Sequence, residues 1–261
     1  MKVEVLILGV GSSGGSPALG CSCPTCTSSD PKNSRSRASS VLRVGGKTFL
    51  IDTGPDLRYQ ALREQLLHVD AVLYTHPHAD HLNGIDDLRA FCWLQKAPIP
   101  VFGNEFMLDH IRQRFPYTLF PPNNFWDKPV LTLHSVSDST FEFAGIAIEP
   151  IPLMHGKWPI LGYRIGKVAY LTDVSEIPAE SLAKLQGLDI VLLDCLRRVP
   201  HPTHFSVDQA IAAAKQIGAK QTVMIHMTHE LEYHALSQEL PEGVVVGFDG
   251  MRLVSEAGTG L

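Results

Sequence analysis

Three histidines and an aspartate lie within six residues of one another, directly after an apolar segment typical of a buried strand (68–74, HVDAVLY). Neutral imidazoles and carboxylates are ligands of zinc, iron and manganese, so this loop predicts a metal site. His76 and His78 are two residues apart and can point the same way in an extended loop. Asp80 and His81 begin the next turn and can face a second ion. A polar surface loop would explain one histidine, but not three in this run.

Further candidate ligands follow other apolar segments: His155 comes after EPIPLM, Asp173 after VAYLT and His226 after VMI. Each alone is equally typical of an ordinary loop. Together with the histidine loop they supply seven donors, enough for two ions about 3.5–4 Å apart with Asp173 as the bridge. Because open sheets place functional groups at strand ends, the fold must bring these strand ends together. Asp52, after FLI, is expected to hydrogen-bond the histidine loop and not a metal.

The rest of the chain alternates short apolar strands with amphipathic helices. With 261 residues, 44% hydrophobic and 19% charged, it can bury a core, and no repeat or long linker divides it. We therefore expect one α/β domain over residues 1–261. The expected strands are 3–8, 41–44, 48–51, 68–74, 98–102, 141–151, 160–165, 167–172, 189–194 and 222–225; the expected helices are 86–95, 105–120 and 207–217, with a loop at 121–129.

Charge and the N-terminal residues limit the partners and the location. There are 22 Lys and Arg against 27 Asp and Glu, and the net charge of −5 argues against a surface that follows long nucleic acid. The segment MKVEVLILGV is interrupted by Glu4 and has no clear cleavage site. No stretch reaches the ~20 apolar residues of a membrane span, so a cytoplasmic protein is expected.

The first glycine-rich loop matches a dinucleotide-binding motif without its context. Residues 9–14 (GVGSSG) fit G-x-G-x-x-G after a strand, but that motif must open a helix. Gly15, Pro17 and Gly20 follow, and they do not continue a helix. Close approach of backbone to a neighbouring group is the better interpretation of these glycines.

Three of the five cysteines form a compact cluster, Cys21-x-Cys23-x2-Cys26. Three thiolates are one ligand short of a closed tetrahedral zinc site. A redox-active cluster and free thiols are the alternatives, but Pro24 stiffens the turn and no second cysteine group exists, which favours zinc. Cys92 and Cys195 lie in apolar stretches and are expected to be packed thiols.

The pattern His-x-His-x-Asp-His, with a later His, Asp and His, resembles the metallo-β-lactamase superfamily over nearly the whole chain. The resemblance implies an αββα sandwich, two mixed β-sheets flanked by helices, with two divalent ions, manganese or zinc, at one sheet edge. The ligands it implies are His76, His78, Asp80, His81, His155, Asp173 and His226.

Within the superfamily, the chain resembles the PhnP family of phosphoribosyl cyclic phosphate phosphodiesterases of phosphonate metabolism. The residues that carry this resemblance are the cysteine cluster, His204, His226, His229 and Gly247–Met251. It implies a structural zinc held by Cys21, Cys23, Cys26 and His229, and a homodimer. It also implies that His204 is a general acid, with His201 as the rival for that role.

These features predict a metal-dependent phosphodiesterase acting on a small cyclic or compact phosphodiester, with a metal-bridged hydroxide as nucleophile. His204 and Asp80 are the candidate catalytic residues. Lys157 and the segment around Arg37 and Ser39 can also be placed at a phosphate, although solvated side chains are the commoner case.

Three other functions compete with this hypothesis. A transfer-RNA 3′-processing ribonuclease shares the ligand set, but the 52 residues between Asp173 and His226 hold no basic, Gly/Pro-rich RNA-gripping arm. A PqqB-like, non-hydrolytic accessory protein shares the N-terminal Gly and Cys pattern, although seven ligands argue for catalysis. Lactam or thioester hydrolysis is disfavoured by Asp173 and the cysteine cluster.

Overall fold

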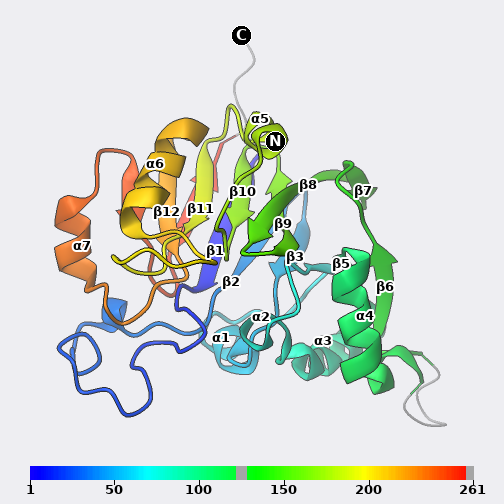
Figure 1. The fold of residues 1–261 in the computed structure, drawn as a ribbon. Helices are drawn as coiled ribbons and strands as arrows, with labels where there is room; N and C mark the ends of the chain where they lie inside the picture. The colour runs from blue at the N-terminus through cyan, green and yellow to red at the C-terminus, as the bar shows by residue number, and fades with distance from the viewer. Residues whose placement is uncertain (122–127, 257–261) are drawn as a thin grey trace.

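Two seven-stranded mixed β-sheets pack face to face in the computed structural model, which describes residues 1–121 and 128–256 (Figure 1). The first sheet has the order β14 (Arg252–Ser255), β1 (Val3–Gly9), β2 (Ser39–Val44), β3 (Lys47–Ile51), β4 (Ala71–Leu73), β5 (Ile99–Gly103) and β6 (Leu131–Ser135). The second has the order β13 (Val244–Val246), β12 (Gln221–Ile225), β11 (Ile190–Asp194), β10 (Val168–Leu171), β9 (Trp158–Ile165), β8 (Ile146–His155) and β7 (Phe141–Phe143). Each sheet has an antiparallel part and a parallel part.

The alternation of side chains along β1 shows why the chain forms layers. Val3, Val5 and Ile7 point into the core between the two sheets, whereas Leu6 and Leu8 point into a second core on the other face. That second core also contains apolar side chains of α1, α3 and α4. The first sheet is therefore buried on both faces, which its nearly continuous apolar strands require.

Helices cover the outer faces of the sandwich. They are α1 (Leu57–Arg63), α2 (Ala79–Leu82), α3 (Leu88–Gln95), α4 (Glu105–Arg114), α5 (Ala179–Lys184), α6 (Val207–Ile217) and α7 (Tyr233–Glu239), with 3-10 turns η1 (Pro31–Asn33), η2 (Ile85–Asp87) and η3 (Pro116–Leu119). The helices α3 and α4 contact the first sheet, and α6 and α7 contact the second. The predicted fold, two mixed sheets flanked by helices, is confirmed. No helix in the described parts of the chain is long and apolar enough to cross a membrane.

Three predicted elements differ from the observed ones. The strand expected at 68–74 is only β4, because the backbone N–H and C=O of Val69 bond to the Gln95 side chain (2.9 and 3.0 Å) and not to a strand. The helix expected at 105–120 ends before Pro116, and the strand expected at 141–151 is interrupted by a turn at Ala144 and Gly145, both with positive φ. Most of the loop predicted at 121–129 (residues 122–127) lies outside the described residues.

Three non-glycine residues at strand ends have left-handed backbone conformations. Asp52 follows β3 with φ of 60°, Asp173 follows β10 with φ of 57°, and His226 follows β12 with φ of 59°. Such conformations are uncommon outside glycine and concentrate at functional sites. Asp173 Oδ1 and His226 Nε2 lie 3.4 Å apart, and Asp52 contacts the neighbouring His81 ring at 2.8 Å.

Candidate metal centre

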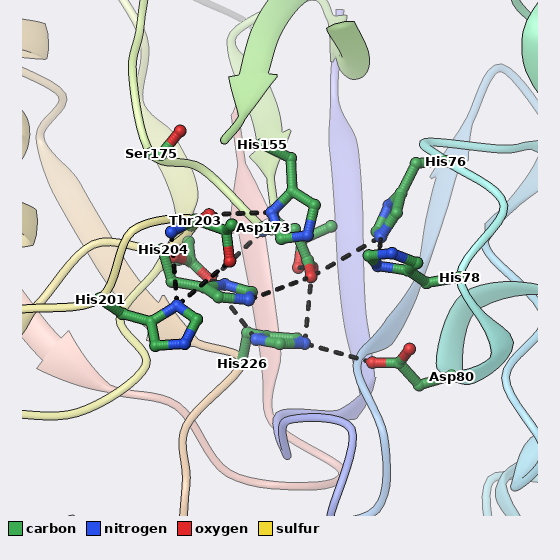
Figure 2. Close-up of polar contacts among 12 residues, drawn as sticks. His76, His78, Asp80, His155, Asp173, Ser175, His201, Thr203, His204 and His226 are labelled. Atoms are coloured by element: carbon green, nitrogen blue, oxygen red, sulfur yellow. Dashed lines mark hydrogen bonds and ion pairs between the residues drawn. The ribbon is translucent and has the colours of Figure 1, made fainter. Parts of the chain in front are cut away.

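Four side chains at strand ends form the first group of potential ligand atoms. They are His76, His78, His155 and Asp173, with one ligand atom each, all within 4.8 Å of one another (Figure 2). His76 Nε2 lies 3.0 Å from His78 Nδ1 and 3.7 Å from Asp173 Oδ2. Such separations suit neighbouring ligands of one tetrahedral ion, because each metal–nitrogen bond is about 2.0–2.1 Å long.

A second group shares the same aspartate. Asp80, His81, Asp173 and His226 also place one ligand atom each within 4.8 Å of one another. His81 Nε2 lies 3.1 Å from Asp173 Oδ1, and His226 Nε2 lies 3.4 Å from the same oxygen. One carboxylate oxygen of Asp173 therefore faces each group, the arrangement that a bridging ligand requires.

The buried Nε2 of His81, which has no hydrogen-bond partner among the described residues, indicates that a cation fits between the ligands of the second group. His81 Nε2 is buried beside the carboxylates of Asp80 and Asp173, at 3.3 and 3.1 Å, but it has no hydrogen bond of acceptable alignment. Buried polar atoms are nearly always satisfied, so this one needs a partner. A divalent ion between the nitrogen and the two carboxylates would satisfy all three groups. The residues present therefore fit divalent metal ions in both groups.

The charges around this edge stabilise positive charge. Burial alone would lower the pKa of His81, but the carboxylates of Asp173 and Asp80 outweigh it and raise that pKa well above its ordinary value. Burial would likewise raise the pKa of Asp173, but the His226 and His81 rings hold it well below the usual range. In the first group, burial lowers the pKa values of His76, His78 and His155, which favours the neutral imidazole that binds metal.

Neighbouring groups orient the rings from behind. Asp52 accepts hydrogen bonds from the backbone N–H and hydroxyl of Thr75, both at 2.8 Å, and lies 2.8 Å from His81 Nδ1. This is the contact with the histidine loop that the sequence predicts. His155 Nδ1 donates to the carbonyl oxygen of Thr203 at 2.8 Å, so its Nε2 is left for the first ligand group. Such contacts fix the tautomer of a ligating histidine.

His204 lies beside the bridging aspartate. Its Nε2 is 3.8 Å from Asp173 Oδ2, and its ring stacks on that of His226, with centroids 4.9 Å apart. His201, the rival for the acid role, is more exposed, and its Nδ1 lies 3.1 Å from the Thr203 hydroxyl (Figure 2). Between the two, the geometry places His204 and not His201 beside the ligand groups.

Asp194 is a residue of this site that the sequence analysis missed. Its carboxylate lies 3.2 Å from His204 Nδ1 and 3.4 Å from His226 Nδ1, and it accepts a hydrogen bond from the backbone N–H of Phe205 at 2.9 Å. It is fully buried at the last position of β11. The signal that singled out Asp173, a carboxylate at the end of an apolar strand, would have found it.

The cysteine cluster forms a separate group of potential ligands. Cys21, Cys23, Cys26 and His229 have ligand atoms within 4.8 Å of one another, and His229 Nδ1 lies 3.4 and 3.3 Å from the sulfurs of Cys21 and Cys23. The His229 ring and the Cys26 backbone N–H lower the pKa of Cys23 to about 6, which favours the thiolate that binds metal. The chemistry of this donor set suits zinc.

The remaining candidates lie outside these groups. Arg37 pairs with Asp56 at 2.8 Å, and the buried Ser39 hydroxyl donates to backbone carbonyls. Lys157 is exposed on the turn between β8 and β9. At Gly11 a side chain would lie 2.7 Å from the Arg35 carbonyl oxygen, which explains the glycine without a nucleotide. Cys92 and Cys195 are buried, as expected.

Comparison with known proteins assigns the fold to a family. The β-lactamase superfamily domain matches residues 47–227. The crystal structure of a new diphosphatase from the PhnP family superposes with a TM-score of 0.91 at 39% identity, covering 98% of each chain. Zinc-bound PqqB from Methylobacterium extorquens superposes with a TM-score of 0.77 at 21% identity, covering 96% of this chain and 99% of PqqB. At that identity the second likeness concerns the fold alone.

A curated relative is considerably longer than this chain. An octanoyltransferase of Porphyromonas gingivalis is 40% identical over 97% of this chain, but the match spans only 51% of that protein. The chain thus covers about half the length of this relative, whose name describes the whole polypeptide.

Proposed function

The chain belongs to the β-lactamase superfamily, and we propose on that basis that it is a metal-dependent phosphodiesterase. Its substrate is a small, compact phosphodiester such as phosphoribosyl 1,2-cyclic phosphate. One observation carries the proposal: Asp173 lies between two groups of ligands, with a histidine that belongs to neither group beside it. A bridged pair of ions suits in-line displacement at phosphorus. The PhnP-family diphosphatase, 39% identical to this chain, is by name a phosphate hydrolase, which supports hydrolysis at phosphorus.

Two divalent ions, zinc or manganese, would supply Lewis acidity toward phosphoryl oxygens and a water of lowered pKa. His76, His78, His155 and Asp173 would hold one ion, and Asp80, His81, Asp173 and His226 the other. A third, structural zinc would be held by Cys21, Cys23, Cys26 and His229.

The proton for the leaving oxygen comes from His204 in this proposal. Its Nδ1 faces the Asp194 carboxylate. Its Nε2 faces the ligand groups and lies 3.8 Å from Asp173 Oδ2. Asp194 thus keeps the proton-bearing Nε2 aimed at the substrate, as a general acid requires. Asp80 faces His81 and His226 from the opposite side and is the second candidate catalytic residue.

A transfer-RNA-processing ribonuclease is the main rival. Such an enzyme grips its substrate with an extended arm, whereas residues 174–225 of this chain include β11 and β12 of the second sheet and the helices α5 and α6, which contact that sheet (Figure 1). A homodimer is a part of the proposal that comes from the family resemblance, and a cytoplasmic location is a part that comes from the sequence.

Hydrolysis by metal-quantified protein tests the proposal. The substrates are bis-(p-nitrophenyl) phosphate and a 2′,3′-cyclic nucleotide, with and without added manganese. We expect His204→Ala to lower kcat by about 10²–10⁴-fold at unchanged metal content. His201→Ala is the matched control, because its ring lies 5.3 Å from that of His204 but the residue is in neither ligand group. Metal-loaded protein that turns over neither substrate would overturn the proposal, and cleavage of a precursor transfer RNA would favour the rival.

A further inference from the structure

A single arginine side chain contacts both ends of a segment that carries three of the seven candidate ligands. Arg114 is the last residue of α4 and is exposed. Its Nη1 donates to the carbonyl oxygen of Pro77 at 2.7 Å, and its Nη2 donates to the side-chain oxygen of Asn83. Pro77 precedes the ligand His78, and Asn83 follows α2. The guanidinium therefore joins the two ends of the segment 77–83.

The end of β3 holds this segment from the other side. Asp52 lies 2.8 Å from His81 Nδ1, and the Thr53 backbone N–H donates to the carbonyl oxygen of His81 at 2.7 Å. Gly84, just beyond the segment, donates its backbone N–H to the carbonyl oxygen of Thr53 at 2.8 Å. These contacts fix the part of the segment that belongs to the second ligand group. They do not reach its beginning, which carries His78.

His78 differs from the other histidines of the first ligand group in what holds its ring. His76 Nδ1 lies 3.0 Å from Thr75 Oγ1. His155 Nδ1 lies 2.8 Å from the carbonyl oxygen of Thr203. Across residues 1–121 and 128–256, the ring of His78 has one hydrogen-bonding contact, at 3.0 Å, and its partner is the ligand nitrogen of His76. The direction of this ring therefore depends on its backbone and its packing.

The bond from Arg114 acts on that backbone. The Pro77 carbonyl belongs to the planar peptide unit that joins Pro77 to His78. A hydrogen bond to its oxygen limits the rotation of this unit, and with it the direction in which the His78 side chain leaves the chain. The Trp158 ring, 5.0 Å from that of His78, adds packing against the same imidazole.

Charge alone does not explain an arginine at this place. A guanidinium is always positive, and like charges repel, so Arg114 should weaken the binding of a cation by the neighbouring ligands. Its two acceptors are neutral oxygens and not carboxylates. What an arginine provides here is its rigid, planar fork of N–H groups, which can bond two separate oxygens at once.

We propose that Arg114 is a positioning residue, which fixes the segment 77–83 and, through Pro77, aims His78 at the ion of the first ligand group. This inference rests on the proposed function, because it concerns the same metal centre. Position and charge predict opposite signs. Loss of Arg114 weakens the binding of this ion if the side chain positions His78, and it strengthens the binding if the positive charge dominates.

Chelator competition with metal-loaded protein measures this sign without a substrate. Zinc per chain is determined after dialysis against rising concentrations of nitrilotriacetate. We expect Arg114→Ala to lower the affinity for one ion by about 10–100-fold, the usual effect of losing a group that orients a ligand, with the cysteine zinc retained. Arg114→Lys keeps the charge without the fork and should recover part of the affinity. Arg112→Ala is the matched control on the same helix, because Arg112 pairs with Glu105 and Asp109 and should leave all affinities unchanged.

Asn83→Ala provides a second measurement, because it removes one acceptor and leaves the Pro77 contact. We expect a smaller loss of affinity than in Arg114→Ala, and no further loss in the double variant, since both changes break the same bond. If Arg114→Ala does not fold, Arg114→Lys and Asn83→Ala decide the question. Unchanged or higher affinity in the Arg114 variants, or an equal loss from all sites, would overturn the inference. If these variants lose the one ion but the wild type hydrolyses no phosphodiester, the proposed function fails and the positioning role stands.

Discussion

The two candidate metal sites of this protein are built on different kinds of structure. The His/Asp groups stand at the ends of β8, β10 and β12 and in the loop after β4, where nearly every ligand is buried. The cysteine cluster stands on the long loop between β1 and β2 and on the loop after β12, where most of its ligands are half-buried. Strands hold ligands at fixed separations, whereas the separations of ligands on loops depend on the ion that binds between them.

This difference suits the His/Asp groups to catalysis and the cysteine cluster to a structural role. The His/Asp groups share one carboxylate, and the carboxylates of Asp52 and Asp194 contact the outer nitrogens of the His81 and His226 rings, so the fold itself prepares the site. The cysteine cluster has four donors for one tetrahedral ion and leaves no position for a substrate. Because His226 and His229 are three residues apart, a metal held by the cysteine cluster would also fix the segment that carries His226. The following predictions test this division.

Removing the bridging charge should have the largest effect on activity. In Asp173→Asn both ligand groups lose their shared carboxylate, so we expect kcat to fall at least as far as on loss of a general acid, about 10²–10⁴-fold. Metal analysis should show loss of ions from the His/Asp groups with zinc retained by the cysteines. Asp189→Asn, at a buried aspartate that pairs with Lys220, is the matched control. Retained activity in Asp173→Asn would contradict the bridging role.

Removing a thiolate should act on stability. A structural zinc contributes directly to folding free energy, so Cys23→Ser should lower Tm by about 10 °C in a chain of this size. Turnover per folded, metal-loaded molecule should stay within a few-fold of wild type. Calorimetric unfolding with and without a chelator measures the effect. Cys92→Ser, outside the cluster, should show a shift that does not depend on metal. A Cys23→Ser protein with wild-type Tm would contradict the structural role of the cysteine cluster.

Regular elements of the fold were predictable where local signals agree. The helix at 207–217 was predicted with its observed bounds. The structure shows the local signals that fix them: Ser206 and Gln209 form a capping box, and Gly218 ends the helix in a left-handed conformation. The strand at 68–74 was overestimated, because the side chain of Gln95, distant in sequence, takes the backbone bonds of Val69. A tertiary hydrogen bond of this kind leaves no periodic signal.

The site was predictable as a set of residue types but not as a geometry. The seven ligand candidates could be chosen because each follows an apolar run, and the structure brings them together. The directions in which these side chains point could not be predicted, since they depend on positive φ at Asp173 and His226, and at Asp52, which contacts His81. Asp194 also ends an apolar run and could have been chosen in the same way, but its role is visible only in the structure, where His204 and His226 lie against it.

Asp194 provides the next test of the strand-built site. In Asp194→Asn the bond from the Phe205 N–H can persist, but the charge facing His204 and His226 is lost. We expect kcat to fall about 10–100-fold, the usual effect of losing a group that orients site residues. Steady-state kinetics with metal quantification measures it, and the double variant with His204→Ala should be little worse than His204→Ala alone. Additive losses would mean that Asp194 acts independently of His204.

The smallest expected effect is on the pH dependence of stability in metal-free protein. The contributions of the two sites to the free energy of unfolding should change with pH in opposite directions. The folded pKa of Cys23, about 6, lies below its ordinary value of 9.0, so its contribution is full above pH 9 and is lost as pH falls toward 6. The folded pKa of His81 lies above its ordinary value of 6.5, so its contribution is full below that pH and is lost as pH rises through the folded value. Urea unfolding between pH 6.5 and 8.5 measures both slopes. Cys23→Ser should remove a stability gain with rising pH, and His81→Asn should remove a loss. Parallel curves for wild type and both variants would show that neither site is charged before metal binds, and that the cations alone organise them.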